Sequence, residues 1–298
     1  MAQQALPERD ARLGKPLGAS GDEGARATLR RGGAGRSGRS VSGVALLLPD
    51  GSPGGTGRPS PLPALAVRPL AGRLARAGRA EGLTAHVVRY RRRGWNGGAA
   101  DPARDAAWAV AEVVRRYGDV PVCLVGAGMG ARAALHAAGH PAVGAVLGLA
   151  PWFPEPGADG GRPEAADDAG PGGAAASGPQ ASADGPARHA ADPVKQLVGR
   201  HVLLVHGTND RRTDPELSYR YAERAKKINR DTCRFEVHSD GHALLQHRSE
   251  VHALAVDFLL GALFAQDFAR PVQDAMAAPP PLGLRMPLAA GFGASLRR

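Results

Sequence analysis

The chain has 298 residues, 43% of them hydrophobic and 22% charged, a length that accommodates one large domain or two small ones. The formal net charge of +10 comes mainly from arginine, with only four lysines among 38 basic residues; the arginine runs lack the interleaved aromatic side chains on which bases stack, so we expect a solvated basic surface and no nucleic-acid partner. No segment approaches the roughly eighteen apolar residues that cross a bilayer, and no signal-peptide core is present near the start, so we expect no membrane partner and a cytoplasmic location.

Composition divides the chain into regions. Residues 1–40 are polar, rich in glycine and arginine and without period, so we predict a disordered N-terminal arm. The apolar runs fall within 41–268, which we predict to be one domain. Within it, residues 154–192 are almost free of large apolar side chains and read as a low-complexity insertion. Residues 269–298, rich in proline, alanine and glycine, are predicted to be a loosely attached C-terminal tail.

Strand and helix patterns alternate through this domain. The expected strands are continuously apolar runs, at residues 44–48, 84–90, 120–125, 143–149, 201–205 and 233–237. The expected helices carry apolar residues at helical spacing, at residues 67–77, 101–117, 129–138, 215–225 and 251–262. Continuously apolar strands belong in a parallel sheet that is covered on both faces. The predicted fold class is therefore α/β, with a mostly parallel, doubly wound sheet.

The two cysteines give no sign of a disulfide or a metal site. Cys123 lies inside one apolar strand and Cys233 begins another, without the spacing of a metal motif. We expect Cys123 to be a buried, inert thiol, and we predict no cofactor.

Polar and glycine-rich loops follow four of the predicted strands. Ligands and catalytic groups of open parallel sheets collect at the carboxyl ends of the strands, so these loops are expected to meet. They are PDG at residues 49–51, GAGMG at 126–130, HGTND at 206–210 and SDGH at 239–242.

These loops resemble the α/β-hydrolase superfamily over residues 41–264. The RYRRRGWNG segment at 89–97 and the RYAERAKK segment at 220–227 further resemble small actinobacterial α/β-fold hydrolases of esterase or serine-aminopeptidase type. The superfamily pattern is a GxSxG nucleophile elbow, then an acid, then a histidine, each after a later strand. By this resemblance GAGMG is the elbow, Asp210 is the acid and His242 is the histidine. The implied activity is hydrolysis of carboxylic esters or amides.

The sequence departs from that pattern at the nucleophile itself. The third residue of the elbow is Gly128, which has no hydroxyl to attack a substrate. We therefore expect a catalytically impaired or ligand-binding protein with an empty position where the serine hydroxyl would lie. The amides of Met129 and Gly51 are the expected oxyanion donors, which leaves a small carbonyl or carboxylate compound as the possible ligand. On this view Gly128→Ser should restore some reactivity towards a fluorophosphonate.

Other interpretations stay open at this point. Catalysis without the elbow serine would need Ser52, or a water molecule activated by His242 in the space left by the hydroxyl. GAGMGA also satisfies the GxGxxA pattern of dinucleotide-binding proteins, although no acid follows the next strand to hold the ribose. His238, His242 and His247 invite a metal site, but their spacing matches no standard zinc set.

Two further points concern side chains near these loops. Asp210 could also serve only as a loop or helix cap, which is a common use of aspartate. Trp152 and Phe153 follow the strand at 143–149 and would either line a substrate pocket or pack in the core. Nothing in the sequence predicts the oligomeric state.

Overall fold

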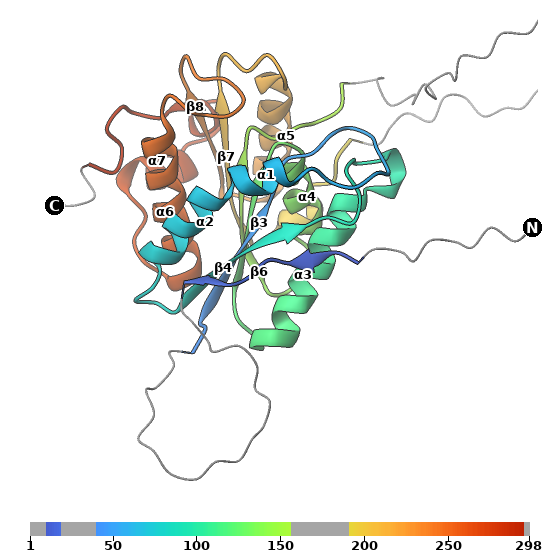
Figure 1. The fold of residues 1–298 in the computed structure, drawn as a ribbon. Coiled ribbons are helices and arrows are strands. Elements are labelled where there is room, and N and C mark those ends of the chain that lie inside the picture. The colour runs from blue at the N-terminus through green and yellow to red at the C-terminus, as the bar shows by residue number, and fades with distance from the viewer. Residues whose placement is uncertain (1–9, 19–39, 156–190, 295–298) are drawn as a thin grey trace, which may run out of the picture.

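The structure is a computed structural model that describes residues 10–18, 40–155 and 191–294 (Figure 1). Most of the predicted N-terminal arm and nearly all of the predicted insertion at 154–192 lie outside the described residues.

A mostly parallel sheet forms the centre of the domain, as the continuously apolar runs predict. Its six main strands run parallel in the spatial order β4-β3-β5-β6-β7-β8. Their side chains are almost entirely buried because helices cover both faces of the sheet. These strands are β3 (Gly43–Leu48), β4 (Leu83–Arg89), β5 (Val122–Ala127), β6 (Val143–Leu149), β7 (His201–Gly207) and β8 (Thr232–Val237).

Helices lie on both faces of this sheet, in two layers that Figure 1 shows on opposite sides of the strands. Successive strand residues contribute to different cores, so that Leu46 packs in one layer and Leu47 in the other. One layer contains α3 (Asp101–Tyr117), α4 (Met129–Ala137) and α5 (Pro215–Ile228). The other contains α2 (Arg68–Ala77), α6 (Arg248–Phe264) and α7 (Arg270–Ala277), and the short α1 (Pro61–Ala66) precedes α2.

Both edges of the sheet are extended by segments that the sequence assigned to tails. At one edge β1 (Arg12–Leu13) and β2 (Leu17–Gly18) pair antiparallel with β4, so this part of the predicted arm is ordered. At the other edge β9 (Met286–Pro287) pairs parallel with β8.

The predicted C-terminal tail is likewise part of the domain. Residues 269–294 include α7, the 3₁₀ turn η3 (Leu282–Leu284) and β9, and Val272 and Leu284 are completely buried. The prediction of a loosely attached tail was therefore wrong for these residues. The physical reason is that strands of two residues carry almost no periodic signal, while their pairing with exposed edge strands satisfies backbone groups that only the tertiary structure brings together.

Among the described residues, no helix combines the length and the apolarity that crossing a lipid bilayer requires.

Candidate functional site

A tight turn joins β5 to α4 and places Gly128 at its centre. Gly128 has φ 53° and ψ −118°, a conformation that strains residues with a side chain. Its amide donates to the Leu149 carbonyl at 2.9 Å, and its carbonyl accepts from the Trp152 amide at 3.0 Å. At Gly130 a Cβ atom would collide with the carbonyl oxygens of Leu48 and Pro49. The turn thus brings the start of α4 directly against the end of β3.

Asp210 and His242 meet on the other side of this edge of the sheet. Asp210 follows β7, His242 lies between β8 and α6, and His242 Nδ1 is 2.8 Å from Asp210 Oδ2. The Thr213 hydroxyl donates to the same oxygen at 2.7 Å, while the amides of Arg212 and Thr213 donate to Oδ1. The Asp210 side chain is completely buried. With His206, described next, five groups contact its two oxygens and fix the orientation of the carboxylate.

His206, the last polar side chain of β7, is the fifth of those groups. Its Nε2 lies 3.2 Å from Asp210 Oδ2, and its Nδ1 lies 2.9 Å from the Ser218 hydroxyl. Burial lowers the pKa of His206, and together with the positive charge of buried Arg234 it outweighs the hydrogen bond to Asp210, so the shift favours the neutral ring. Burial by itself raises the pKa of Asp210, but the hydrogen bonds from His206, Thr213 and the backbone amides reverse this and keep it far below its usual value.

The structure adds a residue to this site that the sequence analysis did not select. Asp50 lies in the loop after β3, and the elbow follows β5, the neighbouring strand that pairs with β3. The Asp50 carboxylate therefore reaches the elbow. Asp50 Oδ1 accepts from the amides of Gly51 at 2.8 Å and Met129 at 2.9 Å, the two expected oxyanion donors. Asp50 Oδ2 lies 3.3 Å from His242 Nε2 and 3.2 Å from Arg212 Nη2.

The position expected to be empty is therefore occupied. A Cβ atom built on Gly128 would collide with Oδ1 and Cγ of Asp50 and would lie 2.9 Å from Oδ2. The expectation of a free space beside His242, open to an attacking water, was wrong because the carboxylate of a neighbouring loop fills it. The expectation that the Met129 and Gly51 amides are open to a ligand needs the same correction, since both already donate to Asp50.

Charge complementarity holds Asp50 and His242 together. Burial raises the pKa of Asp50, but the hydrogen bond from His242, the two backbone amides and the charge of Arg212 outweigh it and lower the pKa overall. Burial lowers the pKa of His242, but hydrogen bonds to Asp50 and Asp210 outweigh it and raise the pKa overall. Both shifts favour the charged forms of the two side chains, and the His242 ring lies between two carboxylates.

A sequence signal for Asp50 does exist, but it is weak. Asp50 stands in the PDG loop at the carboxyl end of a predicted strand, where site residues of parallel sheets collect. Aspartate in such a loop is usually a turn residue. Only the packing of the β3 and β5 loops shows that its side chain points to the elbow.

The other nucleophile candidates lie in unsuitable surroundings. The Ser52 hydroxyl is exposed and donates to the Gly54 carbonyl at 2.8 Å, within its own loop. Cys123 and Cys233 are both completely buried. Burial raises the pKa of the Cys123 thiol well above its usual range and that of Cys233 to about 12, so neither forms a thiolate near neutral pH.

The histidines of the β8–α6 loop do not form a metal centre. His238 is exposed, whereas the backbone amide of His247 donates to Asp240 Oδ2 at 3.0 Å. Across residues 10–18, 40–155 and 191–294, no three His, Cys, Asp or Glu side chains are grouped so as to bind a metal ion.

The dinucleotide interpretation meets a physical obstacle at the start of α4. A pyrophosphate bound to a GxGxxA turn lies at the helix N-terminus, where free amides and the helix dipole attract negative charge. Here the amide of Met129, the first residue of α4, already donates to the Asp50 carboxylate.

Trp152 and Phe153 contribute to packing. The Arg132 guanidinium lies 4.0 Å from the centroid of the Trp95 ring and 4.9 Å from that of Trp152. Phe153 stacks on Tyr221, with ring centroids 4.8 Å apart. Both aromatic residues therefore pack against other side chains of the domain, as one of the two expectations held.

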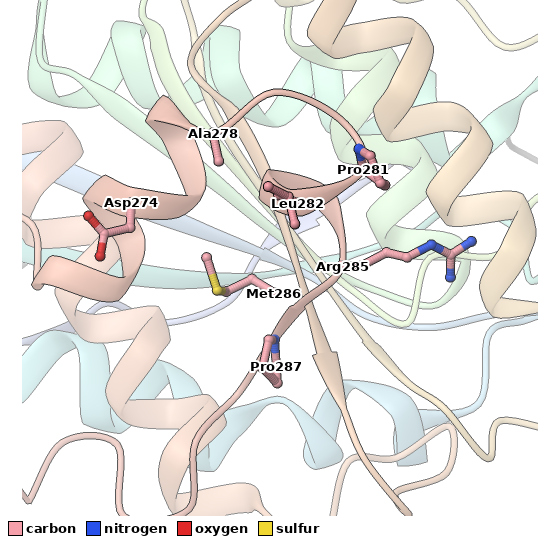
Figure 2. A pocket seen from close by; sticks show the side chains of 7 residues that line it. All are labelled: Asp274, Ala278, Pro281, Leu282, Arg285, Met286 and Pro287. Carbon is pink, nitrogen blue, oxygen red and sulfur yellow. The ribbon is translucent and has the colours of Figure 1, made fainter.

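A hollow lies elsewhere, along the C-terminal segment between α7, η3 and β9 (Figure 2). Its lining is mainly apolar, and its charged side chains are those of Asp274 and Arg285. Arg285 already pairs with Glu216 at 2.9 Å and Glu236 at 3.3 Å. None of the site residues described above lines this hollow.

Similarity to known proteins is found at the level of solved structures. No protein-family model and no curated protein matches the sequence. Among solved structures, an esterase from Pyrococcus furiosus is similar with a TM-score of 0.52 at 14% identity, over 75% of this chain and 83% of that one. A putative alpha/beta hydrolase from Agrobacterium tumefaciens is similar with a TM-score of 0.47 at 15% identity, over 76% of this chain and 88% of that one. At such identities the likeness concerns the fold and not the activity.

Proposed function

We propose, from the premise that this chain has the α/β-hydrolase fold, that it is a pseudo-hydrolase. On this proposal it retains the acid and histidine of a serine-hydrolase site but does not hydrolyse carboxylic esters or amides through a covalent intermediate. The observation that carries the proposal is the Asp50 carboxylate, which fills the space beside Gly128 and uses both oxyanion amides.

The chemistry of ester hydrolysis explains why this arrangement argues against activity. The covalent route needs a nucleophile, a neutral histidine that accepts its proton, and amides that stabilise the oxyanion. Gly128 supplies no nucleophile, and the carboxylates on both sides of His242 favour its protonated form. In a model protease, loss of the serine alone lowers turnover by about 10⁶.

Direct attack by water is disfavoured for the same reason. A water molecule would need His242 Nε2 as its base and the two amides for the developing oxyanion. All three groups face the Asp50 carboxylate.

The test compares wild-type protein with variants at the elbow. We expect the wild type to remain unlabelled by a fluorophosphonate and not to accelerate hydrolysis of p-nitrophenyl acetate. Gly128→Ser alone should stay inactive because its Cβ atom collides with Asp50, which revises the expectation drawn from the sequence. Gly128→Ser combined with Asp50→Gly should hydrolyse the ester at least about tenfold faster than wild type, since serine, histidine and free amides are then together.

The controls separate this recovery from a change elsewhere. Adding His242→Ala to the double variant should abolish both the labelling and the recovered hydrolysis. Labelling or turnover by the wild type, lost on His242→Ala, would contradict the proposal.

A further inference from the structure

Four N–H groups from four parts of the chain converge on one carboxylate. The amides of Gly51 and Met129 donate to Asp50 Oδ1, and the His242 ring and the Arg212 guanidinium face Oδ2. Arg212 is positively charged, the carboxylates beside His242 favour its charged form, and the Met129 amide lies at the positive end of the α4 dipole. Each carboxylate oxygen thus has two N–H groups beside it, which is the pattern that recognises R–COO⁻.

We infer that these four donors form a binding site for a small free carboxylate, which the protein fills with the Asp50 side chain as a tethered resident ligand. The inference rests on the proposed function, because a serine at the elbow would take up the same space. It gives Gly128 a specific role, since any Cβ at this position would exclude the carboxylate.

The frame of the site does not depend on the Asp50 side chain. Before Asp50, the Tyr90 hydroxyl donates to the Pro49 carbonyl at 3.0 Å. After it, the Trp95 amide donates to the Ser52 carbonyl at 3.0 Å. These contacts hold the loop on both sides of residue 50.

The His242 ring and the Met129 amide are also positioned independently of Asp50. His242 is held by Asp210 and Thr213, and the Met129 amide is fixed by the turn and by α4. The Arg212 side chain is 62% exposed and that of Asp50 20%, so a ligand reaches the site from solvent. Removing the Asp50 carboxylate should therefore leave the two amides and the His242 ring oriented and accessible to an anion, with the Arg212 guanidinium close by.

In the wild type the tether makes the resident carboxylate a strong competitor. A group linked through one short connection acts at an effective concentration of about millimolar or higher. Free acetate should therefore bind the wild type at least about tenfold more weakly than a variant without the side chain.

The experiment is a titration with sodium acetate, followed by NMR of the Met129 amide and the His242 ring, with sodium chloride as the control for ionic strength. In Asp50→Gly, the space left by the side chain matches acetate, whose methyl carbon takes the place of Cβ. We expect saturable shifts in this variant. We also expect the pKa of His242 to be lower than in wild type and to rise again when acetate is bound, because the hydrogen bond that His242 donates to the Asp50 carboxylate raises it.

Two further variants make the test specific. Asp50→Ala retains Cβ and should bind formate at least about tenfold more tightly than acetate, whereas Asp50→Asn keeps a side chain in the site and should bind neither anion measurably. If Asp50→Gly does not fold, Asp50→Ala with formate carries the same test.

The inference is overturned if a folded Asp50→Gly or Asp50→Ala variant shows no saturable shift at Met129 and His242. Equal acetate affinity in wild type and Asp50→Gly would also overturn it. Neither result depends on the esterase assay, so failure of this inference is distinguishable from failure of the proposed function.

Discussion

The two sides of the site have very different relations to the hydrolase pattern. The acid–base side, comprising the loops after β7 and β8, joins Asp210 and His242 as the resemblance implies. The nucleophile side, comprising the loops after β3 and β5, has Gly128 at the elbow and the carboxylate of Asp50 on the amides of Gly51 and Met129. The acid–base side has the hydrogen bond between acid and histidine that the pattern implies, whereas on the nucleophile side the Asp50 carboxylate fills the space where a serine side chain would lie.

The difference between the two sides indicates which interactions keep the residues of each side in place. Asp210 is completely buried and bonded to several donors, so loss of any partner leaves polar groups unsatisfied whether or not the protein is an enzyme. The elbow carries a conformation that glycine adopts without strain, and its neighbouring amides need only an acceptor. Stability alone is therefore enough to retain the acid–base side, while the nucleophile side tolerates an exchange.

The largest expected loss of stability comes from removing the buried carboxylate of the acid–base side. Asp210→Ala should lower the free energy of unfolding by about 3 kcal/mol or more, because it leaves buried donors and the charged His242 without that partner. Urea unfolding measures the change, with Asp214→Ala as the matched control, since that exposed N-cap aspartate should cost about 1 kcal/mol. Equal losses in the two variants would show that the Asp210 network does not stabilise the fold.

The next effect concerns the nucleophile side and is smaller. Gly128→Ser should cost about 1–3 kcal/mol of unfolding free energy from backbone strain, with an added cost from the collision with Asp50. Gly128→Ala should have a similar cost, because the Cβ atom causes both the backbone strain and the collision with Asp50. Combining Gly128→Ser with Asp50→Gly should cost less than the sum of the single changes, which thermal or urea unfolding of the double-mutant cycle measures. Strict additivity would mean that the two residues do not compete for space.

The pH dependence of stability sharpens the comparison because it reports the bond between the two sides. Burial lowers the pKa of His242, but Asp50 and Asp210 raise it above 6.5, so this stabilisation is complete below pH 6.5 and is lost as the pH rises through the folded value. Despite burial, the pKa of Asp50 is lowered below 3.8, so its contribution is present above that pH and is lost as the pH falls through the folded value.

Asp50→Asn should therefore reduce the loss of stability that wild type shows as the pH rises above 6.5. Urea unfolding between pH 6 and 9 measures this, and Asp214→Asn, at an exposed position, is the control. Identical pH profiles for wild type and Asp50→Asn would show that Asp50 does not pair with His242 in solution.

The smallest effect is expected at Ser52, which lies next to the nucleophile side but takes no part in it. Ser52→Ala removes an exposed hydroxyl that bonds only within its loop, so the free energy of unfolding should change by no more than about 0.5 kcal/mol. Ester hydrolysis by the elbow double variant should be the same with or without this change. A loss of that activity would place Ser52 in the site.

The sequence by itself determined the α/β class, the strands on which the site is built, and the loops that carry Asp210, His242 and Gly128. These features follow from local periodicity and from the rule that loops at the carboxyl ends of parallel strands meet. Only the tertiary structure decided that the Asp50 carboxylate fills the space beside Gly128, because this depends on the pairing of β3 with β5 and on the direction of one side chain. It also decided that residues 12–18 and 286–287 extend the sheet, since pairing at an edge depends on distant backbone that no local pattern records.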